Sequence, residues 1–437
     1  MDSLLYQVLR AANPWLDRPE AFPAAAAWRV PEPFVPRRVA GIASWPVSGK
    51  AHLLVGARQV GKTSLLWQRV LAAGTPPLFL DAAEPSVREW CRHPVLVLRD
   101  LRDLVSAQTP VLLDEAQHLE EAGLLIKGLV DGGLAPPLYV TGSSAFHLRA
   151  RTRESLAGRA VRVQLHPFSL AEIAGDLSHL APIPARAIVR EAASSHVVRG
   201  GYPEAWRAED PEPVLARLVD AFVLRDASDL GRIQDLTAFR TVLALLARQV
   251  GNLVNVSEWA AYSGVSRGTV DRYLDLLEEC HLVRRVPPFA AGRRLEVTHR
   301  PKVLFCDCGL RNLLVRSMAP FPERPDAGAL FENWVGAELL KGLDPLHPLD
   351  VLRTWRSSSG AEVDWVLDRP DGLVAVEVKA AALRRPQLSR SARSFIAAYS
   401  PRDFWVVNLD LCAEEQLGGT RVHWVGPEGL LPGGILR

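Results

Sequence analysis

The sequence has few sulfur-containing residues, almost no net charge and no long apolar run. Its 437 residues include 5 cysteines and 2 methionines. The cysteines are odd in number and scattered, without paired metal-ligand spacing, which argues against a disulfide framework and suits a reducing cytosol. Because neither a signal peptide nor an apolar stretch of transmembrane length is visible, we expect a cytoplasmic protein without a membrane partner.

The charge balance favours no particular partner. The formal net charge is +2 at pH 7, so bulk electrostatics give no argument for nucleic acid. Apolar residues make up 48% of the chain and charged residues 23%, as in ordinary globular proteins. A chain of this length should hold about two to four domains, each with its own core.

One stretch fits the pattern G-x-x-x-x-G-K-[ST] and carries the clearest chemistry. It comprises Gly56, Ala57, Arg58, Gln59, Val60, Gly61, Lys62, Thr63 and Ser64. Residues 52–55 before it are typical of a buried strand, and residues 64–71 after it are predicted to be helical. A glycine-rich turn at a helix N-terminus points backbone N–H groups at one spot, which favours a triphosphate. We therefore expect ATP, with Lys62 at its β- and γ-phosphates and the Thr63 hydroxyl on Mg²⁺.

A second strand-like run, residues 110–113, ends in Asp114 and Glu115. Apolar residues followed by Asp-Glu, about fifty residues after a P-loop, are typical of a Walker B strand. Asp114 is predicted to hold the Mg²⁺ shell. Glu115 is predicted to polarise the water that attacks the γ-phosphate.

Two further positions are predicted to act on the γ-phosphate. Ser143 or Ser144, at the end of a third strand-like run, would sense this phosphate, although a simple Gly-Ser turn is the alternative. Arg159 precedes the strand-like residues 161–165 and is a candidate arginine finger, for a nucleotide in its own or in a neighbouring subunit. A finger that acts on a neighbour requires a homo-oligomer.

The middle of the chain is predicted to be helical. Residues 169–250 have helical periodicity and are interpreted as a lid beside the nucleotide. Ser169 and Glu172 form a capping box at its start. Further along, the proline-rich residues 319–325 are interpreted as a linker.

Residues 255–286 follow the pattern of a helix, a short turn, a second helix and the entry into a wing. This pattern predicts a winged helix whose second helix contacts DNA, with Arg267 and Arg272 at bases or phosphates. The alternative is a module that only packs or binds protein.

The last part of the chain contains a second possible site. Asp364 lies on a predicted strand, and Glu377 and Lys379 lie on its hairpin partner beyond a turn at residues 371–372. This is the catalytic pattern of restriction-endonuclease-like folds. Asp364 and Glu377 would bind Mg²⁺, Lys379 would orient or activate water, and Glu332 from the preceding helix would complete the metal shell. The alternatives are a surface hairpin with a solvated ion pair, or a fold that keeps these residues for architecture or binding.

Together these pieces resemble one family, the prokaryotic AAA-type ATPases whose C-terminal part is called domain of unknown function 4143. The resemblance covers roughly residues 35–410. It rests on the P-loop and on residues 112–117, 141–144, 156–159, 167–169, 200–203, 331–333, 360–364 and 376–379. It implies an additional-strand P-loop core, a winged helix and a nuclease-like C-terminal domain, and it supports Arg159 as a finger. Fold carries over from such a kinship better than function.

The sequence therefore predicts an α/β protein. Its parts are a P-loop NTPase core of the additional-strand, AAA-like type, a helical lid, a winged-helix module and a C-terminal restriction-endonuclease-like domain. The expected boundaries are 1–40 for an N-terminal arm, 41–168 for the core, 169–250 for the lid, 251–325 for the winged helix and linker, and 326–437 for the nuclease-like domain.

The expected function is an ATP-hydrolysing, Mg²⁺-dependent machine or switch that acts on DNA. Its nuclease-like domain would either cut or only grip nucleic acid. One alternative is an ATP-controlled signalling switch that binds a protein partner without DNA. The other is an ATP-licensed nuclease effector in defence.

Overall fold

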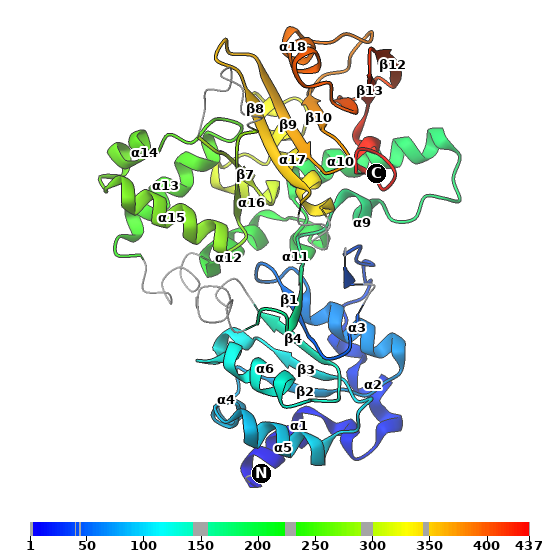
Figure 1. The fold of residues 1–437 in the computed structure, drawn as a ribbon, viewed down its shortest axis with the longest axis vertical. Helices are drawn as coiled ribbons and strands as arrows, with labels where there is room; N and C mark the ends of the chain where they lie inside the picture. The colour runs from blue at the N-terminus through cyan, green and yellow to red at the C-terminus, as the bar shows by residue number, and fades with distance from the viewer. Residues whose placement is uncertain are drawn as a thin grey trace. The chain divides into compact units, whose positions relative to one another are not determined.

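The computed structural model describes residues 3–39, 41–42, 45–142, 156–222, 233–289, 300–343 and 349–436. The chain forms two compact units, Met1–Leu165 and His166–Arg437 (Figure 1). None of the helices in these ranges combines the length and apolar character needed to cross a membrane.

The first unit is built on a five-stranded parallel sheet. Its strands are β1 (Ala51–Val55), β2 (Leu78–Asp81), β3 (Val111–Asp114), β4 (Leu138–Gly142) and β5 (Ala160–Gln164), in the spatial order β2-β3-β4-β1-β5. Its helices are α1 (Ser3–Ala12), α2 (Phe22–Ala26), α3 (Lys62–Ala73), α4 (Pro85–Cys91), α5 (Pro94–Leu104) and α6 (Ala122–Asp131), with short 3-10 turns η1 (Pro14–Leu16), η2 (Pro19–Ala21), η3 (Ala27–Arg29) and η5 (Ala116–His118). Strand β4 lies between β1 and β3, which is the additional strand that the sequence predicts.

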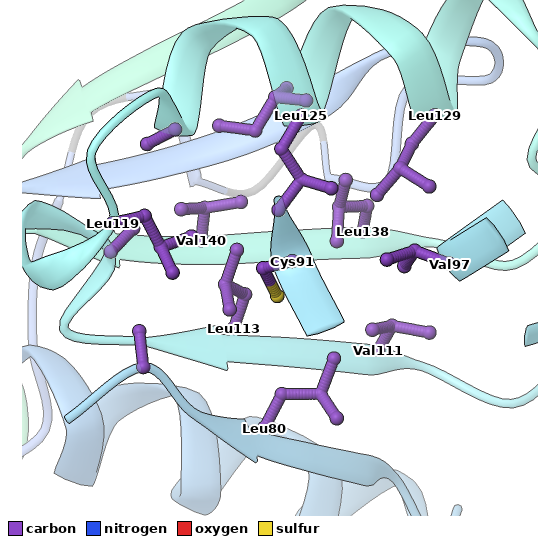
Figure 2. Close-up of a cluster of buried hydrophobic side chains, with 14 of the residues drawn as sticks. Leu80, Cys91, Val97, Val111, Leu113, Leu119, Leu125, Leu129, Leu138 and Val140 are labelled. Atoms are coloured by element: carbon purple, nitrogen blue, oxygen red, sulfur yellow. The ribbon is translucent and has the colours of Figure 1, made fainter. Parts of the chain in front are cut away.

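One face of this sheet is covered by an aliphatic core (Figure 2). Val111 and Leu113 alternate along β3 and therefore point to the same face of the sheet. Leu125 and Leu129, one turn apart on α6, pack down onto them from the helix above. As is typical of a parallel sheet that is covered on both faces, every residue of the central strands β1, β3 and β4 is buried and most are apolar.

The N-terminal segment is an integral part of this unit. Leu5 and Leu9 of α1 lie in the same core. The Asn13 side chain both accepts from Phe79 N (2.6 Å) and donates to Phe79 O (2.9 Å), so it pairs with the open edge of β2 as a strand residue would. The Trp15 indole donates to Pro77 O at 2.7 Å. The predicted arm is thus fastened to the edge of the sheet.

The second unit begins with helices. They are α9 (Leu170–Ala174), α10 (Pro182–Arg199), α11 (Pro203–Arg207), α12 (Glu212–Ala221), α13 (Leu236–Arg248), α14 (Val256–Ser263) and α15 (Arg267–Glu279). The capping box of Ser169 and Glu172 is present in full, and Ser266 caps α15 by accepting from Thr269 N. A two-stranded antiparallel sheet of β6 (Val283–Val286) and β7 (Lys302–Phe305) follows, and then α16 (Cys308–Leu314).

The unit ends in a six-stranded mixed sheet. Its strands are β8 (Val351–Arg356), β9 (Glu362–Asp368), β10 (Val374–Val378), β11 (Asp403–Val407), β12 (Ala413–Leu417) and β13 (Thr420–Val425), in the order β12-β13-β11-β10-β9-β8. Helices α17 (Ala327–Gly342) and α18 (Arg390–Tyr399) and the 3-10 turn η7 (Pro427–Leu430) accompany it. The predicted hairpin of β9 and β10 is present, but residues 369–373 form a longer loop than the predicted two-residue turn.

The predicted linker is packed inside this unit. The rings of Phe321 and Phe331 stack with centroids 5.4 Å apart. Arg324 is buried and pairs with Asp326. Aliphatic side chains before and after the segment, such as Leu304 and Leu330, belong to one core cluster. Residues 319–325 therefore do not separate two compact bodies.

A buried polar network explains several of the motif residues in this unit. Asp307 accepts from Gly201 N at 2.7 Å, and Glu338 accepts from Leu170 N at 2.7 Å. Lys341 pairs with Glu338 at 2.7 Å and donates to the Phe168 carbonyl at 3.0 Å. The residues around Phe168 and Gly201 are thus part of the architecture, since they fix α16 and α17 to the helices that begin the unit.

The cysteines differ in exposure. Cys91, Cys280, Cys306 and Cys308 are buried, and Cys412 is exposed. Burial raises the pKa of the Cys91, Cys306 and Cys308 thiols to about 12.

Candidate nucleotide site and carboxylate cluster

The loop between β1 and α3 takes a shape that its two glycines permit. Gly56 has φ +156°, and a Cβ at this position would lie 2.2 Å from the Leu165 carbonyl oxygen. Gly61 has φ +93° and immediately precedes α3. Only glycine adopts such backbone at low cost. The N-terminal N–H groups of α3 are consequently presented at the mouth of the loop.

The Lys62 side chain lies inside this loop. It is 5% exposed, and its ammonium donates to the carbonyls of Gly56 (3.1 Å) and Ala57 (2.8 Å). The Lys62 ammonium thus places one positive charge within the loop, where backbone carbonyls hold it. A polyphosphate bound there would offer that ammonium stronger, charged acceptors.

Thr63 and Asp114 come together at the carboxyl ends of the strands. The Thr63 hydroxyl lies 2.9 and 3.0 Å from the two Asp114 carboxylate oxygens. Burial raises the pKa of Asp114, and the charge of Glu115 adds to this, while hydrogen bonds from Thr141 and Thr63 oppose the rise. A hydroxyl beside a buried carboxylate is a donor set that suits Mg²⁺, so these are the residues that would hold it.

Thr141 at the end of β4 is a site residue that the sequence reasoning missed. Its hydroxyl donates to Asp114 and accepts from Glu115 N at 3.0 Å. It therefore fixes the adjoining Asp and Glu at once. The available signal was its position at the end of an apolar strand, where the prediction favoured the serines that follow.

Glu115 adopts a left-handed backbone conformation with φ +54°. This is uncommon for a residue with a side chain and costs roughly 1 kcal/mol or more. The Glu115 carboxylate accepts from the Gln117 side chain and lies 4.0 Å from His118 Nε2. It is thus held at the strand end, beside the Asp114 carboxylate.

Two arginines of the N-terminal segment also reach this region. Arg37 donates to the Val60 carbonyl in the loop at 2.8 Å. The Arg29 guanidinium stacks 4.5 Å from the Trp67 ring and 4.7 Å from the Phe79 ring. No sequence pattern pointed to either contact.

The predicted γ-phosphate sensors and finger have different outcomes. Ser143 and Ser144 lie outside the described residues. Arg159 directly precedes β5, at the edge where the parallel strands begin, whereas the P-loop follows their carboxyl ends. A strand the length of β1 separates the two edges by roughly 13 Å, so Arg159 does not reach the nucleotide loop of its own chain. Its guanidinium pairs with Asp131 at 2.6 Å and is one-third exposed.

The second site is assembled as the hairpin pattern predicts. Asp364 on β9 accepts from Val378 N at 2.7 Å. Glu377 on β10 pairs with Lys379 at 2.7 Å and accepts from the Ser389 hydroxyl at 3.0 Å. The side chains of the predicted catalytic pattern are therefore neighbours on one side of the sheet.

Glu332 joins this cluster, together with two residues that were not predicted. Lys302 of β7 donates to Glu332 at 2.6 Å and to Glu362 at 3.0 Å. Burial and the nearby Glu332 charge raise the pKa of Asp364 to about 7, and burial also raises the pKa of Glu332 against the opposing charge of Lys302. Among the described residues, no three acidic, histidine or cysteine side chains are arranged to hold one metal ion.

Comparison with known families agrees with this organisation. The model of an AAA domain matches residues 48–174, and that of a domain of unknown function (DUF4143) matches residues 327–420. The chain carries an AAA domain followed by DUF4143. Between them, residues 190–320 match a further domain of unknown function (DUF8612).

Relatives of the chain match about three quarters of its length. Uncharacterized proteins of Mycobacterium tuberculosis and Mycobacterium bovis are 28% identical over 348 residues, covering 78% of this chain and 72% of theirs. An uncharacterized protein of Haemophilus influenzae is 25% identical, covering 75% of this chain and 81% of its own.

Solved structures give a weaker likeness. A RuvB mutant of Thermotoga maritima is 18% identical, with a TM-score of 0.26, over 55% of this chain and 83% of that one. Cdc6p of Pyrobaculum aerophilum is 15% identical, with a TM-score of 0.24, over 57% of this chain and 83% of that one. At these scores the likeness carries no argument, so assignment of the AAA domain rests on the family model and on the strand order.

Proposed function

We propose that this protein binds and hydrolyses ATP and acts on DNA. The observation that carries the proposal is the contact of Thr63 with Asp114, beside the buried Lys62 and the N-terminus of α3. An ammonium, a hydroxyl, a carboxylate and the backbone N–H groups of a helix N-terminus at one point are the parts that phosphoryl transfer from a nucleotide needs.

Each residue has a role in this proposal. Lys62 and the backbone of the loop bind the phosphates and neutralise the charge that develops on them. Mg²⁺, held by Thr63 and Asp114, supplies further charge stabilisation when bound. Glu115 orients the attacking water, and Thr141 keeps Glu115 and Asp114 in register. Arg159 reaches the nucleotide of a neighbouring copy, which makes the active form a homo-oligomer.

Two features support DNA as the partner. Helices α13, α14 and α15, followed by β6 and β7, have the order of elements of a winged helix. Arg267 and Arg272 are exposed on α15, the second helix of the predicted helix-turn-helix. In the C-terminal domain, Asp364, Glu377 and Lys379 have the order of a restriction-endonuclease-like site, which either cleaves DNA or only binds it.

A second candidate function is an ATP-controlled switch that binds a protein. The exposed face of α15 also carries Asp271 and Asp275, so its charge is mixed. Carboxylates on a recognition helix repel phosphates and weaken electrostatic binding to nucleic acid. Mixed charge suits a protein partner better.

ATP turnover with single-stranded, duplex and branched DNA, each at two salt concentrations, separates these functions. For the DNA machine we expect stimulation by one DNA form that weakens as salt rises, because phosphate contacts release counterions. Turnover that responds to none of the three forms contradicts action on DNA and favours the protein switch.

The nucleotide site itself is tested with Lys62→Ala. We expect turnover to fall by at least about a hundredfold, since a charge that acts on the transferred phosphoryl group is lost. Lys50→Ala removes an exposed lysine outside the loop and should leave turnover unchanged. Normal hydrolysis by the Lys62→Ala protein would overturn both candidate functions.

A further inference from the structure

A lysine from outside the DUF4143 domain is buried among the carboxylates of that domain. Lys302 belongs to β7, and its side chain is 2% exposed. Its ammonium donates to Glu332 Oε1 and Glu362 Oε1 and lies 5.4 Å from the centre of the Trp365 ring. Because taking an ammonium out of water is unfavourable unless it is paired, these partners are what hold it there.

The other carboxylates of the cluster are engaged as well. Asp364 Oδ2 accepts from a backbone N–H. Glu377 uses one oxygen for Lys379 and the other for the Ser389 hydroxyl. Magnesium requires about six oxygen ligands in near-octahedral geometry. A divalent ion would therefore have to displace several hydrogen bonds and share the carboxylates with an ammonium already in place.

Lys302 is held in the cluster by its strand. Residue 302 pairs with Val286 across the β6–β7 sheet and forms a bridge with Leu253. Two residues on, Leu304 lies in the same apolar core as Leu330 of α17. Lys379, in contrast, has a side chain that is 47% exposed and can swing away. The ammonium of Lys302 has no comparable path out.

We infer that Lys302 is an internal cation that takes the place of a divalent metal in the DUF4143 domain, so that this domain binds its partner without metal-dependent cleavage. The inference rests on the proposed nuclease-like arrangement of the carboxylates. It extends the proposed function by deciding between cutting and gripping. The carboxylates of this cluster, already engaged by Lys302, Lys379 and Ser389, do not fit the divalent metal that such folds hold.

Binding of Mn²⁺ to the full-length, nucleotide-free protein tests this inference, with free Mn²⁺ followed by electron paramagnetic resonance. We expect the wild-type protein and Asp364→Asn to bind the same amount, because Asp364 contributes to no metal site. Lys302→Met should gain one Mn²⁺ per chain, because it frees the oxygens of Glu332 and Glu362. The double variant with Asp364→Asn should lose that ion again.

Controls separate loss of charge from loss of fold. Lys302→Arg keeps a cation and should bind no more Mn²⁺ than the wild-type protein. A folded Lys302→Met protein that gains no ion overturns the inference, and so does wild-type binding that Asp364→Asn removes. If Lys302→Met does not fold, the wild-type and Asp364→Asn pair still decides. ATP turnover and its response to DNA are measured separately. The Mn²⁺-binding result can therefore be interpreted even if the proposed function fails.

Discussion

Gly56 shows how closely single residues determine the nucleotide loop. A Cβ added at this position would lie only 2.2 Å from the Leu165 carbonyl oxygen. We expect Gly56→Ala to push the loop away from the end of β5 and to weaken nucleotide binding at least tenfold, measured by titration with a fluorescent ADP analogue. Both the steric clash and the required backbone angle oppose the substitution.

Gly49→Ala is the matched control for that substitution. Gly49 also has a positive φ, +69°, but nothing lies within 4 Å of an added Cβ. It should cost only about 1 kcal/mol of stability and leave nucleotide affinity intact. Equal loss of affinity in both variants would contradict the role assigned to the contact between Gly56 and Leu165.

His196 makes stability depend on pH. It is buried, its Nδ1 accepts from the Trp334 indole at 3.1 Å, and burial, reinforced by the charge of Lys341, lowers its pKa well below 6.5. The unfolded chain therefore binds this proton more readily than the folded one as pH falls below about 6.5. The free energy of unfolding should decrease by about 1.4 kcal/mol per pH unit from this group.

Thermal unfolding between pH 7.5 and pH 5.5 measures this effect. His196→Gln should flatten the pH dependence, whereas His179→Gln, at an exposed position, should not. An unchanged slope in His196→Gln would show that the imidazole has the same pKa in the folded and unfolded chains and would contradict this prediction.

At the residue scale, contacts between residues of recognised local motifs could be predicted, whereas contacts between residues far apart in the sequence could not. The predicted neighbours Thr63 and Asp114 do meet, because the P-loop and Walker B patterns encode ends of strands that share one sheet edge. Lys302 was not predicted, because its partners Glu332 and Glu362 are 30 and 60 residues away and no local pattern links them. Thr141 fell between these cases: the strand end was predicted, but the hydroxyl that contacts Asp114 was not named, and the predicted Ser143 and Ser144 lie outside the described residues.

Among the elements, β5 has the clearest functional consequence. Arg159 stands at the start of this strand, on the edge opposite the P-loop, so the proposed action of Arg159 on a nucleotide would require a second copy. We expect Arg159→Ala to bind nucleotide normally and to lose most ATP turnover. Mixing it with Lys62→Ala should restore part of the turnover, because a Lys62→Ala subunit supplies the arginine to an intact loop.

Arg102→Ala is the control for the mixing experiment. Arg102 is exposed on α5 and contacts the Gly132 carbonyl, and its loss should leave turnover unchanged. Mixed Arg159→Ala and Lys62→Ala proteins with no more than the sum of their separate activities would contradict a finger in trans.

Element positions were predicted best where burial was strong. The strands that became β1 and β3 and the helices that became α14 and α17 are close to their predicted places, because apolar residues mark them directly. The edge strand β12 was missed, since its residues are mostly exposed and polar and leave no such periodicity. The pairing of Asn13 with β2 was missed because a side-chain amide, and not a strand backbone, makes the hydrogen bonds there.

At the scale of the whole molecule, the predicted winged helix and the DUF4143 domain pack against each other through buried aromatic side chains. Phe289 follows β6, yet its ring lies 5.4 Å from Tyr399 and 6.3 Å from Phe395 of α18. We expect Phe289→Ala to lower the free energy of unfolding by about 3 kcal/mol, as for other buried aromatic residues. Guanidinium unfolding should show that residues 233–305 and the C-terminal sheet are lost together.

Leu349→Ala is the matched control, since Leu349 is 70% exposed and should change stability little. Separate unfolding of residues 233–305, with the C-terminal sheet still folded, would show that the two parts are independent after all.

The joint predicted at residues 319–325 does not coincide with the boundary between the two compact units, which falls between Leu165 and His166. Proline-rich composition at residues 319–325 indicated a joint, but Phe321 and Arg324 are packed and the core is continuous around them. A proline-rich composition indicates only that a segment is not a regular helix. Whether it is covered depends on aromatic and charged partners elsewhere in the chain, which composition does not contain.

Cys412 offers a practical handle on the unmodified chain. The other four cysteines are buried, so a maleimide dye should attach at this single position. Burial and the nearby Glu428 carboxylate raise the pKa of the Cys412 thiol, so coupling should be slow at neutral pH and efficient in mildly alkaline buffer. One fluorophore per chain, placed without any mutation beside the edge strand β12, would let single-molecule counting report how many copies assemble.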